Sequence, residues 1–182
     1  RILTSLEKYS YDISDDSDSI AIHLYLCGQI IMSDDSVWNI TGKYLTDGKI
    51  EITYSGEERD FTLRLRNPGW STACEIRING LRIKAESEQG YFYILRKWKN
   101  GDTVQLKFGI TAQLVYANTY VEDDAGKVAV MRGPVVFCLE EADNGKNLSE
   151  LMIGTIESHC ENSVILNGYR EHTMDSIALY ST

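Results

Sequence analysis

Hydrophobic and polar residues alternate along much of the chain with the period of two that is typical of β-strands. In residues 19–27 the apolar positions Ile20, Ile22, Leu24 and Leu26 share one face, and Ala21, His23, Tyr25 and Cys27 share the other. Both faces are fairly apolar. This pattern predicts a central strand that is covered on both sides.

Further segments with the same period follow in quick succession. Residues 49–54 place apolar side chains at every second position, and residues 60–66 do the same with Phe61, Leu63 and Leu65. The turn sequence Asn67-Pro68-Gly69 ends the second of these segments.

The next signal is a hairpin in residues 75–83, where Asn79-Gly80 suits the two left-handed positions of a type I′ turn. Residues 90–95 and 102–108 are predicted to pair with each other through the turn at residues 99–102. Strands that recur about every ten residues indicate a β-sandwich or jelly roll.

A Val-rich stretch at residues 127–141 contains two apolar runs separated only by Arg132-Gly133-Pro134. Continuous apolar runs favour strands that are buried on both faces. We therefore expect this stretch to be the centre of the fold. Its predicted core residues are Val128, Val130, Val135 and Phe137.

The remaining segments complete an all-β assignment. Residues 112–116 predict a strand, residues 151–156 and 163–166 are further strand candidates, and Asn167-Gly168 predicts a turn. Residues 1–9 have helical spacing without an N-terminal cap, so we expect the last turns of a helix that begins upstream. The predicted organisation lists three parts: the tail of an upstream helical barrel domain (1–17), a β-sandwich domain (18–110) and a second, smaller β domain (111–182).

Charge excludes one class of partner. The chain has 18 basic and 27 acidic residues and a formal net charge of −9, which argues against binding to nucleic acid. The acidic clusters lie at expected turns and do not have the spacing of an EF-hand loop, so we interpret them as solvated loops. No apolar run approaches the ~20 residues that cross a bilayer, and no membrane partner is expected.

Cysteine and histidine do not form a recognisable site. Cys27, Cys74, Cys138 and Cys160 are far apart, without a Cys-x-x-Cys pair, which favours buried free thiols over disulfides or a zinc ribbon. Unpaired cysteines favour a cytoplasmic location, but a chain that begins at Arg1 without a signal-peptide pattern is expected to be a fragment or processed product, and the compartment of its parent is unknown.

The three histidines are isolated from one another. His23 fits a satisfied core or interface histidine, and His159 beside Cys160 is the nearest approach to a metal pair, with His172 apart from both. The chain has no phosphate loop, nucleophile elbow or His-Glu-x-x-His motif, and the sequence does not show which carboxylates converge as a glycosidase dyad.

Five aromatic residues are candidates for stacking on sugar rings: Trp38, Trp70, Trp98, Tyr91 and Tyr93. The alternative, which we favour, is that tryptophans beside turns cover the ends of the sandwich. Under that interpretation Trp38 lies at a turn, and its replacement costs less stability than that of Phe137.

An ordered series of motifs resembles glycoside hydrolase family 127, the β-L-arabinofuranosidase-like proteins. The series is Arg64-Leu65-Arg66-Asn67-Pro68-Gly69-Trp70, Ile78-Asn79-Gly80, Gly90-Tyr91, Arg96-Lys97-Trp98, Gly101-Asp102 and residues 128–140 with their Arg-Gly-Pro break. The resemblance covers about residues 1–144. It departs from the family at Asn67, where Ile or Val is typical, and it does not extend to the residues after Asn144.

The resemblance implies that catalysis belongs to an (α/α)₆ barrel upstream, where a cysteine nucleophile lies in a zinc site made of cysteines and a glutamate. None of the four cysteines here matches the family's Cys-Cys motif. We therefore expect no catalytic, cofactor-binding or metal residue in this chain. Zinc would belong to the missing catalytic domain, and the fragment alone would be inactive although its parent is a glycoside hydrolase.

Three interpretations of function remain open. The first is the non-catalytic β-sandwich portion of a β-L-arabinofuranosidase-like hydrolase, which packs against and supports the upstream barrel. The second is a carbohydrate-binding module, which requires aromatic residues exposed together on one face or loop end. The third is a structural or adhesive β-sandwich of a surface protein.

Overall fold

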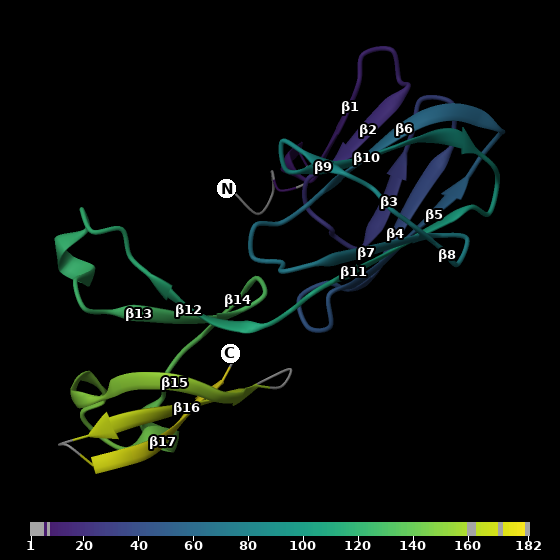
Figure 1. Ribbon diagram of the computed structural model, residues 1–182. Coiled ribbons are helices and arrows are strands. Elements are labelled where there is room, and N and C mark those ends of the chain that lie inside the picture. Colours follow the sequence, from purple (N-terminus) through teal and green to yellow (C-terminus); the bar gives the residue numbers. More distant parts are fainter. Residues whose placement is uncertain (1–5, 7, 160–162, 171–172, 181–182) are drawn as a thin grey trace. The chain divides into compact units, whose positions relative to one another are not determined.

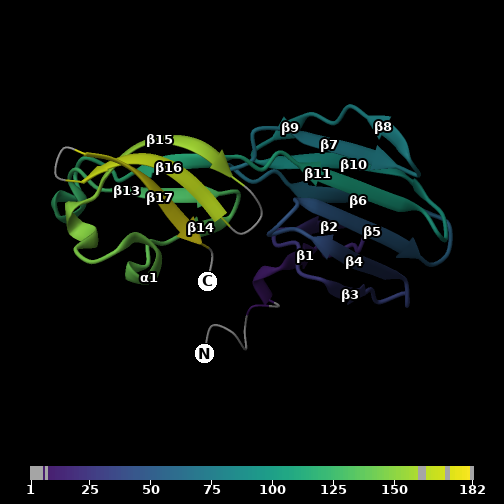
Figure 2. The ribbon, with the colours of Figure 1, turned by 90° about the horizontal axis from the view of Figure 1, so that it is seen from below.

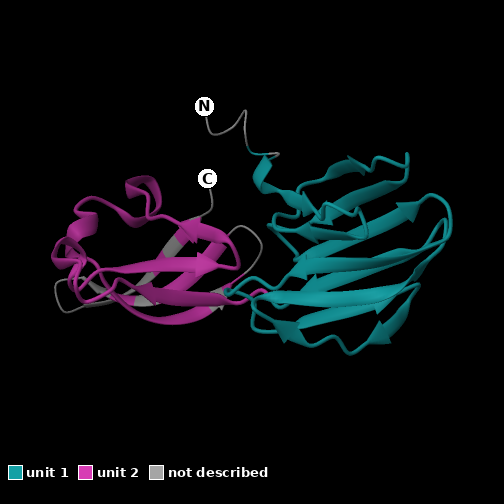
Figure 3. Cartoon of the chain, turned by 90° about the horizontal axis from the view of Figure 1, so that it is seen from above, with its two compact units in different colours: residues 1–109 teal, residues 110–182 magenta. Residues whose placement is uncertain are grey.

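The computed structural model describes the chain except residues 1–5, 7, 160–162, 171–172 and 181–182 (Figure 1). The chain divides into two compact units, Arg1–Gly109 and Ile110–Thr182 (Figure 3). Strands make up most of the regular structure in both, so the all-β prediction is confirmed.

The first unit contains a five-stranded sheet with the order β1-β2-β6-β10-β9. In this sheet β2 and β6 are parallel, and the other neighbours are antiparallel. Its strands are β1 (Tyr11–Ile13), β2 (Ser19–Ile22), β6 (Arg59–Arg66), β9 (Ser87–Glu88) and β10 (Tyr91–Trp98).

A six-stranded antiparallel sheet completes the first unit, with the order β3-β4-β5-β11-β7-β8. Its strands are β3 (Gly28–Ile31), β4 (Val37–Lys43), β5 (Lys49–Ser55), β7 (Cys74–Ile78), β8 (Leu81–Ile83) and β11 (Thr103–Phe108).

One hydrophobic core lies between these two sheets, and period-two alternation supplies it. In β5 the buried residues are Ile50, Ile52 and Tyr54, and in β6 they are Phe61, Leu63 and Leu65, as the sequence predicts. The residues between them face outward, so each sheet has a polar or mixed outer face.

Aromatic rings join the two sheets near the start of β6. Trp38 of β4 lies 5.0 Å from Trp98 and 5.4 Å from Phe61, measured between ring centroids. The indole N–H of Trp98 donates a hydrogen bond of 2.9 Å to the carbonyl oxygen of Phe61, so the buried polar atom of this ring is satisfied.

A second aromatic group lies at the other end of β6. Tyr44 and Phe108 contact each other, and each also contacts both Tyr25 and Trp70, with centroid separations of 5.3–5.9 Å. The Tyr25 hydroxyl donates to the carbonyl oxygen of Arg66 at 2.6 Å. Aromatic contacts therefore close the sandwich at both ends of this strand.

The predicted hairpin at Asn79-Gly80 is confirmed. Asn79 has φ 49° and Gly80 has φ 80°, and Ile78 pairs with Leu81 across the turn. Left-handed backbone at both central positions is the signature of a type I′ turn, which glycine adopts without strain and asparagine tolerates.

The second unit contains two three-stranded antiparallel sheets, β12-β13-β14 and β15-β16-β17. Figure 2 shows β15, β16 and β17 side by side. The strands are β12 (Ala112–Tyr116), β13 (Val128–Arg132), β14 (Val135–Phe137), β15 (Met152–His159), β16 (Ser163–Arg170) and β17 (Thr173–Tyr180).

The helical segments of this unit are one short α-helix and two 3₁₀ turns: α1 (Glu141–Asn144), η2 (Glu122–Asp124) and η3 (Leu148–Glu150). The core of the unit is made by side chains from both sheets, among them Val130, Phe137, Val164 and Leu166.

The prediction that residues 127–141 are the centre of the fold is wrong. They form the β13–β14 hairpin of the smaller unit, and the larger core lies in the first unit. Burial alternates in β14, where Phe137 is 4% exposed and Val136 is 58% exposed. Of the four predicted core residues Val130 and Phe137 are buried, and Val128 and Val135 are half-buried.

The predicted pairing of residues 90–95 with 102–108 is also wrong, because β10 and β11 belong to different sheets. The four residues between them carry the chain from one sheet to the other. A hairpin turn and such a crossing have similar turn residues, so local sequence does not separate them.

The strand predicted over residues 19–27 ends at Ile22. The backbone amides of His23 and Leu24 both donate to the carbonyl oxygen of Ser10, which takes the chain away from β6. Tyr11–Ile13, which the sequence analysis assigned to an upstream domain, pairs with β2 as strand β1. The helix predicted over residues 1–9 lies mostly outside the described residues.

The turn predicted at Asn167-Gly168 lies inside β16 instead. Gly168 is buried, and a Cβ atom there would overlap the side chain of Ile177. The glycine therefore permits close packing within a strand and does not mark a turn.

Trp38→Ala should destabilise the first unit by about 3–5 kcal/mol, because it removes a 1% exposed ring that contacts both sheets. This corrects the expectation that Trp38 lies at a turn. Hydrogen exchange of amides in β4, β5 and β6 measures the loss of protection. Tyr120→Ala, at a residue that is 92% exposed, is the control and should leave this protection unchanged.

Phe137→Ala should destabilise the second unit by about 3–5 kcal/mol through loss of burial and a residual cavity. Val136→Ala on the same strand should have little effect, because its side chain is mostly exposed. The comparison uses exchange of amides in β13 and β16. Equal protection in both variants would contradict the assignment of Phe137 to this core.

Candidate functional site

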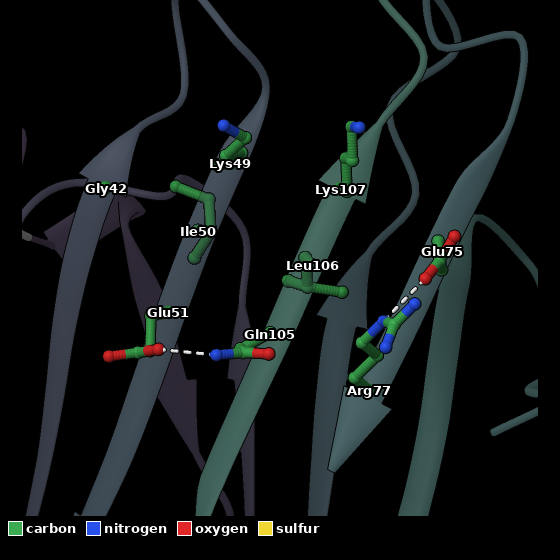
Figure 4. A pocket seen from close by; sticks show the side chains of 9 residues that line it. All are labelled: Gly42, Lys49, Ile50, Glu51, Glu75, Arg77, Gln105, Leu106 and Lys107. Atoms are coloured by element: carbon green, nitrogen blue, oxygen red, sulfur yellow. Dashed lines mark hydrogen bonds and ion pairs between the residues drawn. The ribbon is translucent and has the colours of Figure 1, made fainter. Parts of the chain in front are cut away.

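The outer face of the six-stranded sheet has a shallow depression of about 530 Å³ (Figure 4). Most of the residues that line it come from β5, β7 and β11, and both lining carboxylates are paired with neighbouring side chains. Gln105 donates to the Glu51 carboxylate at 2.8 Å, and Arg77 donates to the Glu75 carboxylate at 2.6 Å, which lowers the pKa of Glu75. This face has no aromatic ring among its lining residues and fits a solvated surface.

The outer face of the five-stranded sheet is different. The strand register places Asp12, Ala21, Arg64 and Tyr93 in one row across β1, β2, β6 and β10. A pocket of about 190 Å³ lies along this row. We call it the tyrosine pocket, and its lining residues are Asp12, Ala21, His23, Arg64, Gln89, Tyr91 and Tyr93.

His23 is held against Tyr91 in this pocket. Its Nδ1 atom lies 2.7 Å from the Tyr91 hydroxyl, and the two rings meet edge to face. Burial lowers the pKa of His23; Asp12 opposes this shift, and the positive charges of Arg64 and Arg66 add to it. The imidazole is therefore neutral at pH 7, which agrees with a satisfied histidine and not with an isolated charge.

Arg64 carries a donor that is not used. Its Nε atom is buried and has no hydrogen-bond partner among the described residues. A buried donor without an acceptor is costly, because it has lost water and gained nothing in return. Because this nitrogen has almost no accessible surface, any contact of Arg64 with a ligand would involve the other N–H groups of its guanidinium.

Gln89 lies in the two-residue turn between β9 and β10, with φ 49°. A non-glycine side chain in the left-handed region costs about 1–2 kcal/mol. The turn thus keeps a side chain with both a donor and an acceptor at the rim of the tyrosine pocket, where glycine or asparagine would fit the backbone better.

The aromatic candidates divide into two groups. Trp38 and Trp98 are buried between the sheets near one end of β6, and Trp70 is half-buried against Phe108 near the other end. Tyr91 and Tyr93 lie on one outer face, and Tyr93 is 44% exposed.

The cysteines do not share one environment. Cys27 and Cys138 are exposed, so the expectation of buried thiols is wrong for them, and Cys160 lies outside the described residues. Cys74 is a half-buried free thiol, and burial raises its pKa to about 12. It is protonated at neutral pH and is a poor nucleophile.

Among the described residues, no group of three His, Cys, Asp or Glu side chains could hold a metal ion. His159 is exposed, and both Cys160 and His172 lie outside the description. In the same part of the chain, no helix has the length and apolar character needed to span a lipid bilayer.

A buried carboxylate fixes the crossing between β10 and β11. Asp102 accepts hydrogen bonds from the Asn79 side-chain amide at 2.7 Å and from the Lys99 backbone amide at 2.9 Å, and Arg96 lies 3.2 Å away. Asn79 in turn accepts from the Thr103 backbone amide. The carboxylate therefore joins the β7–β8 hairpin to the crossing.

Burial alone would raise the pKa of Asp102, but the hydrogen bonds from Asn79 and Lys99 and the charge of Arg96 outweigh it. The pKa is lowered from its ordinary value of 3.8. The ionised form is thus the form that the folded state stabilises.

Comparison with known proteins gives two adjoining matches to family models. Residues 19–110 match the model described as "Beta-L-arabinofuranosidase, GH127 middle domain", and residues 112–173 match "Glycoside hydrolase family 127 C-terminal domain". A non-reducing end β-L-arabinofuranosidase of Bifidobacterium longum subsp. longum is 31% identical over 155 residues. That match covers 81% of this chain, which spans only 23% of the relative's length.

Solved structures show the same similarity. A GH127 β-L-arabinofuranosidase from Geobacillus stearothermophilus T6 matches with a TM-score of 0.78 and 31% identity, over 98% of this chain and 33% of the other. The GH127 β-arabinofuranosidase BT3674 matches with a TM-score of 0.80 and 25% identity, over 98% of this chain and 34% of the other.

Asp102→Asn should lower the free energy of unfolding by about 1–3 kcal/mol at pH 7, because an amide cannot accept all the bonds that the carboxylate accepts. The folded-state pKa lies below the unfolded one. The stabilisation is therefore present above the ordinary pKa and is lost as pH falls through the folded-state value.

Urea unfolding of wild type and variant between pH 7 and pH 2 should show a difference that shrinks at the acid end. The exposed substitution Asp15→Asn is the control. A difference for Asp102→Asn that stays constant with pH would contradict the role of its charge.

Proposed function

The chain belongs to glycoside hydrolase family 127, whose middle and C-terminal domains it comprises, and we propose that it supports the catalytic domain of a β-L-arabinofuranosidase. It is a non-catalytic β-sandwich portion of such a protein. The observation that carries the proposal is the pair of adjoining family matches in a chain that spans 23% of a relative with this activity.

The proposed role of the chain is to pack against and stabilise an upstream (α/α)₆ barrel that contains the nucleophile and the zinc site. The chain contributes no catalytic residue and no zinc ligand under this proposal. None of its four cysteines belongs to a Cys-Cys pair, which is the motif that the resemblance assigns to the barrel. The cytoplasmic location favoured by unpaired cysteines stays a prediction.

Support of this kind is physically reasonable for a rigid sandwich. The core of the first unit contains aromatic rings from both sheets. The connection from β10 to β11, where the chain passes from one sheet to the other, is held by hydrogen bonds to Asp102. A scaffold with such a core keeps its surface in place, as is needed to hold a neighbouring domain in its active conformation.

The isolated 182-residue chain should not hydrolyse an aryl β-L-arabinofuranoside, with or without added zinc. The same chain joined to the upstream domain of its parent should hydrolyse it, and that activity should depend on zinc. Release of the aryl group measures both. Turnover that stays with the isolated chain through purification would overturn the proposal, as would a parent without a preceding catalytic domain.

A further inference from the structure

We propose that the tyrosine pocket binds one sugar unit of an arabinose-containing glycan. The pocket lies on the outer face of the five-stranded sheet, and all of its lining residues come from this chain. Only the choice of arabinose rests on the proposed function.

The size of the pocket suits a single ring. Its volume of about 190 Å³ is below the ~300–1,000 Å³ of sites for drug-sized ligands. Ala21 makes this space, because it stands in the row between the longer side chains of Asp12 and Arg64. A longer side chain at Ala21 would fill it.

The chemistry of the lining also suits a sugar. A sugar ring presents apolar C–H groups on its faces and hydroxyl groups, which both donate and accept hydrogen bonds, around its edge. Tyr91 and Tyr93 offer aromatic surface to the apolar C–H groups. For the sugar hydroxyl groups, Asp12 offers acceptors, Arg64 offers donors and Gln89 offers both.

One feature shows that the pocket is prepared for such contacts. The hydrogen bond between His23 and Tyr91 fixes both rings before binding, which reduces the entropy lost on binding.

The opposite face of the sandwich provides the contrast. There both lining carboxylates are already paired, Glu51 with Gln105 and Glu75 with Arg77, and the lining contains no aromatic ring (Figure 4). Both outer faces are exposed surfaces of the same sandwich, so they differ in their lining side chains and not in the backbone architecture behind them.

The test is affinity electrophoresis of the 182-residue chain in native gels that contain soluble arabinan, with dextran as the comparison polysaccharide. Arabinan should slow the wild-type chain. Tyr93→Ala and Arg64→Met should each raise the apparent dissociation constant about tenfold, which is the effect of losing one good contact.

Two variants serve as matched controls. Leu95→Ala replaces an apolar residue of the same strand that is 75% exposed and does not line the pocket, and Arg77→Met replaces an arginine of the opposite sheet. Both should bind arabinan as the wild type does. The urea midpoints of all variants are measured first, and Gln89→Ala, at an exposed turn, replaces either pocket variant that does not fold.

Mobility that no polysaccharide changes would overturn the proposal. So would equal retardation of the wild type and both pocket variants, or an equal loss in Leu95→Ala, which would indicate a broad apolar docking surface for protein. Retardation by dextran alone would contradict the arabinose class. None of these outcomes alters the activity of the joined protein, so they are distinct from failure of the proposed function.

Discussion

The ring contact between Trp38 and Trp98 is the interaction on which the first unit depends. The two rings come from different sheets, and each is at most 1% exposed. Directly after Trp98 the chain crosses between the sheets, where the Asp102 carboxylate binds the backbone amide of Lys99 and the side chain of Asn79. The Trp38–Trp98 contact and the Asp102 hydrogen bonds therefore lie at the same end of the sandwich. Together they hold the two sheets face to face, which leaves each sheet with one outer face.

Patterns in the sequence correctly predicted those features of the fold that depend only on neighbouring residues. The alternation in β5 and β6 and the Asn79-Gly80 hairpin follow from side-chain period and from φ preferences, which neighbouring residues decide. Partners and burial depend on the whole fold. Residues 127–141 have the composition of a central strand, yet Val136 faces solvent because the small unit covers only one face of β14. Trp38 follows a polar turn and so resembled a surface residue, although it begins the buried face of β4.

The same limit applies to the tyrosine pocket. The period of β10 already places Tyr91 and Tyr93 on one face, and the sequence did single out both residues. Asp12 and Arg64 join them only through the register of β1, β2 and β6, in which one pairing is parallel and skips three strands of the chain. No pattern within a single strand contains that information. The unpaired Nε of Arg64 likewise becomes visible only when its neighbours are in place.

The parallel pairing of β2 with β6 has a consequence for folding order. Strands β3, β4 and β5 lie between these two partners in the sequence, and all three belong to the other sheet. Pairing β2 with β6 closes the long loop between them, and this closure costs chain entropy before the strand contacts form. We therefore expect β2 to join its sheet late, after the antiparallel β4–β5 hairpin has formed. Until then its apolar residues Ile20 and Ile22 stay exposed to other chains, which makes the newly synthesised protein most vulnerable to aggregation at this strand.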